Sequence, residues 1–315
     1  MISVIIIGRN EEKNLSECVV SVKESLNNAA VDDAEIIYVD SASEDRSVEI
    51  AKASGVTSIF ILNEKCINAA VARNVGKQNA RYGILLFVDA DMILKKGAVG
   101  TLLNALEKNQ LVTGWFTNQN KNQTGDGVVF HPFSNSYYLN TMGGFFMLRE
   151  TTWSLVDGMR NYYRKKQDAD FFLRLKRRNV TMYSVPEVLA VHRSLDYMNR
   201  KRMWKMLFRD KNFLYRGLLY SEHIFNPALW PLLIRNDYNL LLLPVSVSLA
   251  VCYSYLFLFV YLIPLVLRSI LKKPRTITDF FMRIPFYFLR DVVVGLSFLF
   301  FWPRRKKEIR YEKVL

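Results

Sequence analysis

The sequence predicts an α/β fold in which a mainly parallel sheet carries helices on both faces. Short β-branched segments alternate with amphipathic stretches through four cycles from residue 2 to residue 88, a pattern typical of parallel strands joined by crossover helices. Polar residues directly follow three of these segments, at 9–11, 40 and 89–91. A dense apolar block begins only after about residue 237 and indicates a separate C-terminal part.

The predicted strands are short apolar segments bounded by glycine or polar residues. Their β-branched and aromatic residues favour extended backbone. The first four lie where the alternation is clearest, and the later ones are less regular. They are expected at residues 2–7, 35–39, 58–62, 84–88, 111–117, 141–148 and 181–185.

Helices are predicted between the strands from apolar residues at helical spacing. Asn14, Ser43 and Asn68 are expected at the starts of the first three, since polar side chains there cap free backbone N–H groups. A fourth helix is expected from Gly97. The polar segment 118–140 predicts a functional loop or a disordered stretch.

Asp89 and Asp91 follow the fourth predicted strand one residue apart. In extended backbone, residues i and i+2 project to the same side, and open α/β sheets bind ligands outside the carboxyl ends of their strands. Two carboxylates there repel each other unless a cation lies between them, and a divalent ion bound to phosphate is the usual partner. The alternative is an acidic turn that caps the next helix.

The charge and cysteine content limit the compartment and the partners. The formal net charge is +14, and basic residues accumulate from Arg160 onward beside long apolar segments, which favours an anionic membrane surface over nucleic acid. Cys18, Cys66 and Cys252 share no metal-ligand spacing and indicate a reducing compartment. Met1 leads directly into the first strand without a secretory signal, so we expect the N-terminal domain to be cytoplasmic.

Three parts are expected along the chain: a domain at 1–195, basic amphipathic interfacial helices at 196–236, and membrane-spanning or re-entrant helices at 237–315. The residues from 193 to 216 alternate basic and apolar side chains, which is typical of a helix on an anionic bilayer.

Two segments are candidates for membrane spans. Tyr238–Leu267 exceeds the roughly 20 residues that a span needs. Ile284–Trp302 is interrupted by Arg290 and Asp291, a costly pair at mid-span, so an interfacial helix is the alternative. The basic residues 304–307 predict a cytoplasmic C-terminal tail, whereas the basic loop 268–275 argues against a simple two-span hairpin.

Six motifs occur in a fixed order over residues 1–195. Together they resemble the family 2 glycosyltransferases of the GT-A fold, which implies a Rossmann-like nucleotide-diphospho-sugar transferase domain. The motifs are Ile-Ile-x-x-Arg-Asn-Glu-Glu, Val-Asp-Ser-x-Ser-x-Asp, Ala-x-Ala-Arg-Asn-x-Gly, Phe-Val-Asp-Ala-Asp, Gly-Gly-Phe-Phe-Met and Gln-Asp-x-Asp-x-x-x-Arg-Leu.

The resemblance implies a binding site for the nucleotide. Gly8, Arg9 and Glu11 would line the pocket for the base and ribose. Asp40 would hold the base by hydrogen bonding. Arg73 would contact the base or the diphosphate.

The resemblance also implies a metal site for Mg²⁺ or Mn²⁺. Asp91 would bind the ion on the diphosphate, and Asp89 would lie near the ribose or a metal-bound water. His192 lies where some relatives place a further metal or phosphate contact. Gly143 and Gly144 would let the ligand approach the backbone closely.

The catalytic base implied by the resemblance is Asp168, which would deprotonate the acceptor hydroxyl. Asp170 is a rival for this role, and both residues could instead cap the helix that begins near them. Two positions depart from the family pattern: Gln167 replaces the usual acidic residue before the base, and Ile7 replaces a proline.

The expected activity is that of an inverting, metal-dependent hexosyltransferase. It would move a sugar from a nucleotide-sugar, expected to be a UDP-sugar, to a lipid-linked saccharide in bacterial surface-polysaccharide biosynthesis. It would act at the cell membrane with its catalytic domain in the cytoplasm. Two alternatives remain open: a polyprenyl-phosphate glycosyltransferase that charges a lipid phosphate, and a non-enzymatic membrane scaffold.

Overall fold

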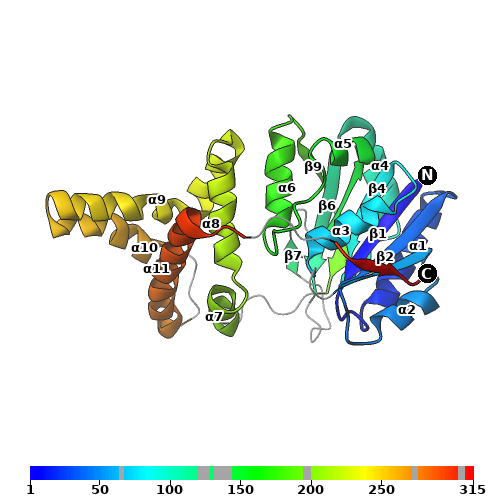
Figure 1. The fold of residues 1–315 in the computed structure, drawn as a ribbon, viewed down its shortest axis with the longest axis horizontal. Coiled ribbons are helices and arrows are strands. Elements are labelled where there is room, and N and C mark those ends of the chain that lie inside the picture. The colour runs from blue at the N-terminus through cyan, green and yellow to red at the C-terminus, as the bar shows by residue number, and fades with distance from the viewer. Residues whose placement is uncertain (64–66, 120–127, 131–143, 194–199, 272–275, 304–308) are drawn as a thin grey trace. The chain divides into compact units, whose positions relative to one another are not determined.

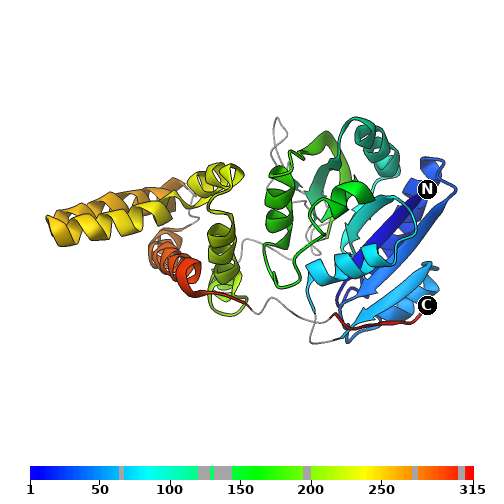
Figure 2. The same ribbon diagram turned by 45° about the horizontal axis from the view of Figure 1, so that its top comes forward.

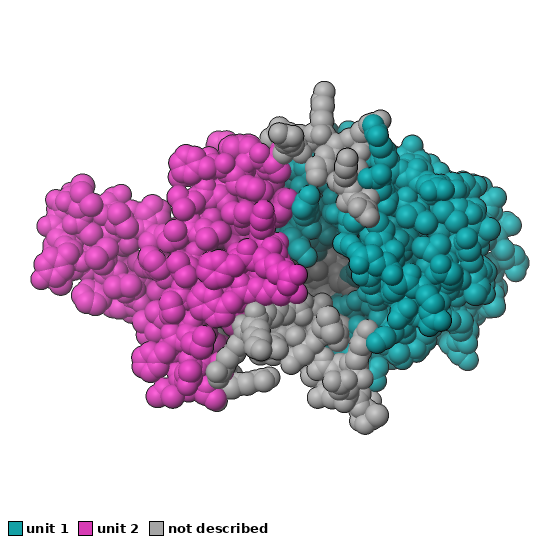
Figure 3. Space-filling model, turned by 60° about the horizontal axis from the view of Figure 1, so that its bottom comes forward, with its two compact units in different colours: residues 1–197, 304–315 teal, residues 198–303 magenta. Residues whose placement is uncertain are grey.

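The computed structural model describes residues 1–63, 67–119, 128–130, 144–193, 200–271, 276–303 and 309–315. The chain forms two compact units, coloured separately in Figure 3: unit 1 is Met1–Tyr197 with Arg304–Leu315, and unit 2 is Met198–Pro303. The expected C-terminal part at 237–315 is therefore divided, because its last residues belong to unit 1. Cys66, Gly143 and most of the segment 118–140 lie outside the described residues.

Four parallel strands form the first half of the sheet in unit 1. They are β1 (Ile2–Gly8), β2 (Ala34–Asp40), β3 (Ser58–Leu62) and β4 (Ile84–Asp89). Gly8 pairs with Asp40, and Ile7 pairs with Asp89. This register brings the carboxyl ends of three strands together, as the sequence predicts.

The second half of the sheet is mixed, so the prediction of a mainly parallel sheet is wrong there. The described strands follow the order β10-β3-β2-β1-β4-β8-β6-β9-β5, with β7 on β6. Because β8 enters between β4 and β6 in the opposite direction, both of its pairings are antiparallel. These strands are β5 (Met92–Leu94), β6 (Leu111–Asn118), β7 (Val128–Phe130), β8 (Phe145–Arg149), β9 (Met182–His192) and β10 (Tyr311–Lys313).

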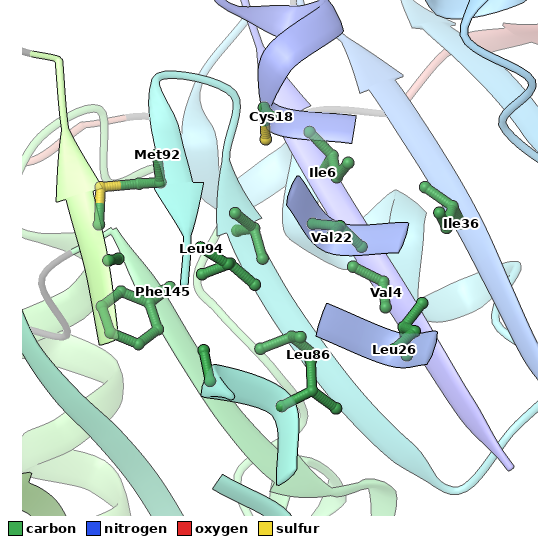
Figure 4. Packing of buried hydrophobic residues seen from close by; sticks show 14 of the residues in the cluster. Val4, Ile6, Cys18, Val22, Leu26, Ile36, Leu86, Met92, Leu94 and Phe145 are labelled. Atoms are coloured by element: carbon green, nitrogen blue, oxygen red, sulfur yellow. The ribbon is translucent and has the colours of Figure 1, made fainter. Parts of the chain in front are cut away.

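Helices cover both faces of the sheet, as expected (Figure 1). On one face, α1 and α4 pack on the strands, and Figure 4 shows Cys18, Val22 and Leu26 of α1 beside Val4 and Ile6 of β1. On the other face lie α3, α5 and α6. The described helices of unit 1 are α1 (Leu15–Asn28), α2 (Ser47–Ala53), α3 (Ala69–Gln78), α4 (Ala98–Lys108), α5 (Glu150–Ser154) and α6 (Gln167–Lys176).

Two of the predicted helix starts have different outcomes. Asn68 caps α3, since its side chain accepts a hydrogen bond of 2.9 Å from the N–H of Val71. Ser43 does not cap α2, which begins at Ser47. There Asp45 accepts the hydrogen bond from the Ser47 N–H at 3.0 Å, because Ser43 is engaged by Asp40 instead.

The C-terminal strand β10 pairs with β3 in antiparallel register, from Tyr311 opposite Leu62 to Lys313 opposite Phe60. Figure 2 shows this strand in red at the edge of the sheet. The strand covers an edge that would otherwise present unpaired backbone groups.

Unit 2 consists of helices in its described residues. The predicted basic helix from 193 to 216 is divided in the structure, because the chain turns at Lys211, whose φ is 52°. The main helices are α7 (Arg200–Phe208), α8 (Asn212–His223), α9 (Trp230–Cys252), α10 (Phe259–Leu271) and α11 (Ile277–Phe300), with short 3₁₀ turns at Pro227–Leu229 and Tyr255–Leu258.

The expected span Tyr238–Leu267 is wrong as a single helix, since α9 ends at Cys252 and the chain turns before α10. The second expected span, Ile284–Trp302, falls largely within α11. Across the residues described here, no helix combines the length and apolar character that crossing a bilayer requires.

Candidate active site

A cleft of about 260 Å³ opens where β1 and β4 end and α3 begins. Five of the predicted site residues line it. Ser41 and Asn68 also line it and were not among the predicted site residues, although Ser41 follows a strand end in the same way as Arg9. The lining residues are Ile7, Gly8, Arg9, Glu11, Ser41, Ile67, Asn68, Ala69, Asp89, Ala90 and Asp91.

The loops after β1 and β2 are bound to each other beside this cleft. The N–H of Asn10 donates to Ser43 Oγ at 2.9 Å, and the N–H of Glu44 donates to Asn10 Oδ1 at 2.9 Å. Arg9 forms an exposed ion pair with Glu44 at 3.1 Å. Asn10 and Ala42 have positive φ values of 57° and 54°, so both loops turn sharply at the strand ends.

Asp40 lies behind the cleft, not in it. Its side chain is fully buried, and it accepts hydrogen bonds from the Tyr38 hydroxyl at 2.9 Å, the Ser43 N–H at 2.7 Å and Ser43 Oγ at 2.6 Å. The expected hydrogen bond from Asp40 to a nucleotide base stays a prediction. In this structure Asp40 orders the loop that lines the cleft.

Two glycines allow close approaches around the acidic residues. A Cβ at Gly8 would lie 2.9 Å from the Ala90 Cβ, which is too close for any other residue. Gly144 has a φ of +88° and would place a Cβ 3.3 Å from Asp89 Oδ2. Its carbonyl oxygen accepts a hydrogen bond of 2.7 Å from the Asp89 N–H. The predicted partner of Gly144, Gly143, lies outside the described residues.

Arg73 reaches Asp89 from α3. Its Nη2 donates to Asp89 Oδ1 at 2.8 Å, and its guanidinium lies 5.7 Å from the centre of the Phe146 ring. Desolvation raises the pKa of the Asp89 carboxyl, and the Arg73 charge opposes that shift. Arg73 Nε is buried without a hydrogen-bond partner. The side chain is thus directed at Asp89 and does not line the cleft.

The Asp91 side chain forms a hydrogen bond with His192, a residue 101 positions later in the sequence. His192 Nε2 lies 3.1 Å from Asp91 Oδ2, and Nδ1 lies 2.9 Å from Asn118 Oδ1. The pairing of Met92 with His192 between β5 and β9 brings the two side chains together. Burial lowers the pKa of His192, but the hydrogen bond to Asp91 and the charges of Asp91, Asp89 and Glu11 together outweigh it, and the pKa is raised.

The residues present fit a divalent ion only if the substrate completes its coordination. Within the described part of the chain, no group of three or more His, Cys, Asp or Glu side chains could hold a metal. Asp91 and His192 supply one oxygen and one nitrogen of the types that Mg²⁺ and Mn²⁺ accept. Asn118 Oδ1 can fix a proton on Nδ1 of His192, which leaves Nε2 available to an ion.

Asp168 and Asp170 differ sharply in their surroundings on α6. Asp170 is fully buried and forms ion pairs with Arg160 at 3.1 Å and with Arg174 at 3.0 Å. Asp168 is partly exposed, and no described side chain forms an ion pair with it. Of the two carboxylates, Asp170 is thus held inside the protein by ion pairs, and Asp168 is the more exposed.

Asn74 of α3 anchors the loop that leads to α6, a role that sequence reasoning missed although the residue lies within a quoted motif. Its Nδ2 donates to the Met159 carbonyl and to Asn161 Oδ1, both at 2.6 Å, and its Oδ1 accepts from the Met159 N–H at 3.0 Å. Arg174 also binds this loop, donating to the Gly158 carbonyl at 2.7 Å. The loop before Asp168 is therefore tied to the helix that carries Arg73.

The sequence of residues 3–171, more than half of the chain, matches the family described as Glycosyl transferase family 2. The chain belongs to glycosyl transferase family 2. It is a glycosyltransferase, and the resemblance seen in its motifs is confirmed at the level of the family. Among curated proteins, no sequence matches this one.

Several solved structures have similar folds at low sequence identity. The mannosyltransferase PcManGT from Pyrobaculum calidifontis, in complex with GDP-Man and Mn²⁺, is 13% identical with a TM-score of 0.59, covering 95% of this chain and 86% of that one. Residues 1–349 of S. aureus TarS in complex with UDP-GlcNAc are 13% identical with a TM-score of 0.52, covering 94% and 89%.

A longer S. aureus TarS structure is 15% identical, with a TM-score of 0.49 over 70% of this chain. The family 2 chain described here spans 43% of the length of that structure. At 13% identity, the likeness to PcManGT and to residues 1–349 of TarS shows a shared fold alone.

Proposed function

We propose that this glycosyltransferase moves a sugar from a nucleoside diphospho-sugar to an acceptor hydroxyl, with inversion and with a divalent cation. The observation that carries the proposal is the contact of 3.1 Å between Asp91 and His192 next to the cleft that Asp91 lines. Asp91 and His192 would hold Mg²⁺ or Mn²⁺. When bound, the cation stabilises the negative charge that develops on the leaving diphosphate.

The donor class is supported by the two similar structures, whose ligands are GDP-Man with Mn²⁺ in one and UDP-GlcNAc in the other. The cleft offers matching chemistry. Gly8 and Ser41 leave space for a base and ribose, while Arg9 and Glu11 supply polar groups at the rim. Asp89, held by Arg73, faces the same cleft and is proposed to lie on the ribose side.

Asp168 is proposed as the general base. It would take the proton of the acceptor hydroxyl as the hydroxyl oxygen attacks the anomeric carbon and the bond to the diphosphate breaks. A single displacement of this kind inverts the anomeric centre. The partial exposure of Asp168, next to the fully paired Asp170, supports this assignment.

The acceptor is proposed to be a lipid-linked saccharide of bacterial surface-polysaccharide assembly, reached from the cytoplasmic face of the cell membrane. Unit 2 exposes many large apolar side chains, far more than soluble monomers usually do. It also exposes three basic side chains: Lys205 on α7, and Arg209 and Lys211 just after that helix. Helices with this composition dock on anionic bilayers without crossing them. Examples of the exposed residues are Val251, Tyr253, Leu256, Phe259, Ile263, Leu271, Phe281, Leu299 and Phe300.

The assay for this proposal is sugar transfer with a panel of nucleoside diphospho-sugars, with and without Mn²⁺. We expect Asp91→Ala to abolish transfer and Asp168→Asn to reduce kcat by about 10²–10⁴-fold, both with unchanged folding. Asp32→Asn, at an exposed carboxylate that precedes β2 at the end opposite to Asp40 and Ser41, is the matched control and should keep full activity.

Full activity in both variants would overturn the site assignment. Activity that tolerates Asp168→Asn and uses an isoprenyl phosphate as acceptor would favour the polyprenyl-phosphate alternative, because a phosphate acceptor needs no general base. Binding to the membrane is tested separately by flotation with anionic and neutral vesicles. We expect binding to anionic vesicles that weakens as salt is raised, and absence of any flotation would contradict it.

A further inference from the structure

Unit 2 contains five charged side chains packed together inside a set of helices with apolar surfaces. Asp237 of α9 forms two ion pairs, with Arg216 Nη1 of α8 at 3.1 Å and with Arg290 Nη2 of α11 at 3.0 Å. Arg290 Nε also donates to Asp291 at 3.0 Å, and Arg268 of α10 lies 3.7 Å from Asp237. We call these five residues the arginine cluster.

The arginine cluster holds three guanidinium groups against two carboxylates, so its charges do not balance. Each carboxylate also accepts a hydrogen bond from one neutral donor. The Tyr220 hydroxyl donates to Asp237, and the Tyr261 hydroxyl donates to Asp291 at 3.1 Å. No further carboxylate among the described residues contacts the arginines of the cluster. One positive charge is therefore uncompensated.

Arg268 is the residue of the cluster that has a buried N–H donor without a hydrogen-bond partner. It is only 8% exposed, its Nη2 donates to the Asn236 carbonyl, and its Nη1 is buried without a hydrogen-bond partner. Its guanidinium lies 4.9 Å from the Tyr287 ring centre and 5.6 Å from that of Tyr238. Burial and the nearby Arg290 lower the pKa of Arg268, which shows how unfavourable its charge is there.

A buried cation with an unfilled N–H donor is costly unless an acceptor is supplied from outside the protein. Guanidinium groups are well matched to oxyanions, above all to phosphate, which accepts several N–H bonds at once. Arg216, whose side chain is 21% exposed, gives the cluster an accessible edge. An anion at this edge would compensate the excess charge, and one that reaches Arg268 would also fill the vacant donor.

We propose that the arginine cluster of unit 2 binds a phosphate-type oxyanion, with Arg268 as its principal donor. The phosphate belongs either to a lipid headgroup, whose chains lie along the exposed apolar helices, or to free inorganic phosphate. The site lies wholly within unit 2, and it is independent of the sugar-transfer site proposed for unit 1.

The test is thermal unfolding and equilibrium binding of the full chain with three probes. These are inorganic phosphate, a short-chain isoprenyl monophosphate in detergent micelles, and the matching isoprenyl alcohol in the same micelles. We expect a phosphate-bearing probe to raise Tm and bind saturably, while the alcohol does neither. Stabilisation by the isoprenyl phosphate alone identifies a lipid headgroup, and stabilisation by inorganic phosphate identifies free phosphate.

Arg268→Met removes the unsatisfied charge while it keeps most of the side-chain volume. We expect this variant to lose at least tenfold in affinity for the phosphate probe, whereas Arg178→Met, the same change at an exposed arginine of unit 1, keeps wild-type affinity. Because two arginines and two aspartates remain, Arg268→Met should unfold at the same temperature as the wild type, or higher, without phosphate.

The wild-type chain alone can overturn the proposal, whatever the variants do. A wild type that shows no saturable response to either phosphate probe, or an equal response to the alcohol, has no phosphate site. Equal affinity of Arg268→Met and wild type would also contradict the assignment.

If Arg268→Met does not fold, Arg268→Lys replaces it, because lysine keeps the charge but loses the planar donor pair. Weaker phosphate binding by Arg268→Lys is then the expected result, and unchanged binding overturns the proposal.

Discussion

Arg73 and Asp89 are joined by an ion pair of 2.8 Å that links α3 to the end of β4. The Arg73 side chain is 7% exposed, whereas that of Asp89 is 34% exposed and faces the cleft. The backbone of Asp89 is held as well, because its N–H donates a hydrogen bond to the Gly144 carbonyl oxygen. The carboxylate is therefore held in position by the protein itself.

This arrangement predicts a measurable coupling between the two residues. Arg73→Met should lower the free energy of unfolding by about 2 kcal/mol, because it removes a hydrogen bond between charged groups. In a double-mutant cycle with Asp89→Asn, followed by urea unfolding, we expect a coupling energy of about 1 kcal/mol. Arg9→Met, which breaks the exposed pair with Glu44, is the control and should change stability by less than about 0.5 kcal/mol. Strict additivity of the two substitutions would contradict the coupling.

The pairing of Asp170 with two arginines predicts that its loss affects stability more than chemistry. Asp170→Asn should lower the free energy of unfolding by about 3 kcal/mol, since it leaves Arg160 and Arg174 without their buried partner. Asp168→Asn should change stability by less than about 0.5 kcal/mol while reducing transfer. Urea unfolding and steady-state kinetics of both variants provide the comparison. A stable, inactive Asp170→Asn protein would instead make Asp170 the base.

The contacts of His192 predict how metal affinity depends on two residues. Mn²⁺ binding, measured by electron paramagnetic resonance with a nucleoside diphosphate present, should weaken strongly in His192→Ala. It should weaken by about tenfold in Asn118→Ala, because Asn118 orients the imidazole and does not touch the ion. Asn109→Ala, at a helix end away from the cleft, should bind Mn²⁺ like the wild type. Unchanged affinity in His192→Ala would show that Asp91 acts without it.

The edge strand β10 predicts a structural role for the last residues. The rings of Tyr311 and Phe60 lie 5.7 Å apart, and Asn79 donates to the Tyr311 hydroxyl at 3.3 Å. Removing residues 310–315 should lower Tm by roughly 3–6 °C and speed amide exchange in β3. Tyr311→Ala should give a smaller shift in the same direction. Wild-type exchange in β3 after the truncation would argue against this role.

Local patterns were enough to predict the first half of the sheet and much of the cleft. Continuous β-branched segments identify β1 and β2, and polar residues at or just after the end of a buried strand mark positions such as Arg9 and Asp89. The parallel register then brings those positions to one edge of the sheet. Nothing more than residue type and spacing was needed for this part.

Features that depend on contacts between residues far apart in the sequence were not predictable from the sequence. The strand β5 has three residues, too few for a periodic signal, yet its pairing with β9 places His192 beside Asp91. The burial of Asp40 depends on the Tyr38 hydroxyl, which points to the same side of the strand. Arg290 interrupts an apolar segment in the sequence, and only the three-dimensional packing shows its partner Asp237 on another helix.

The position of β10 also affects how the chain folds during synthesis. Residues 63–310 are made between β3 and its edge partner, and at roughly 5–20 residues per second this takes about 12–50 s. During that interval the backbone groups of β3 are exposed while the apolar helices of unit 2 leave the ribosome. Until β10 is made, this edge of β3 is open to pairing with strands of other chains.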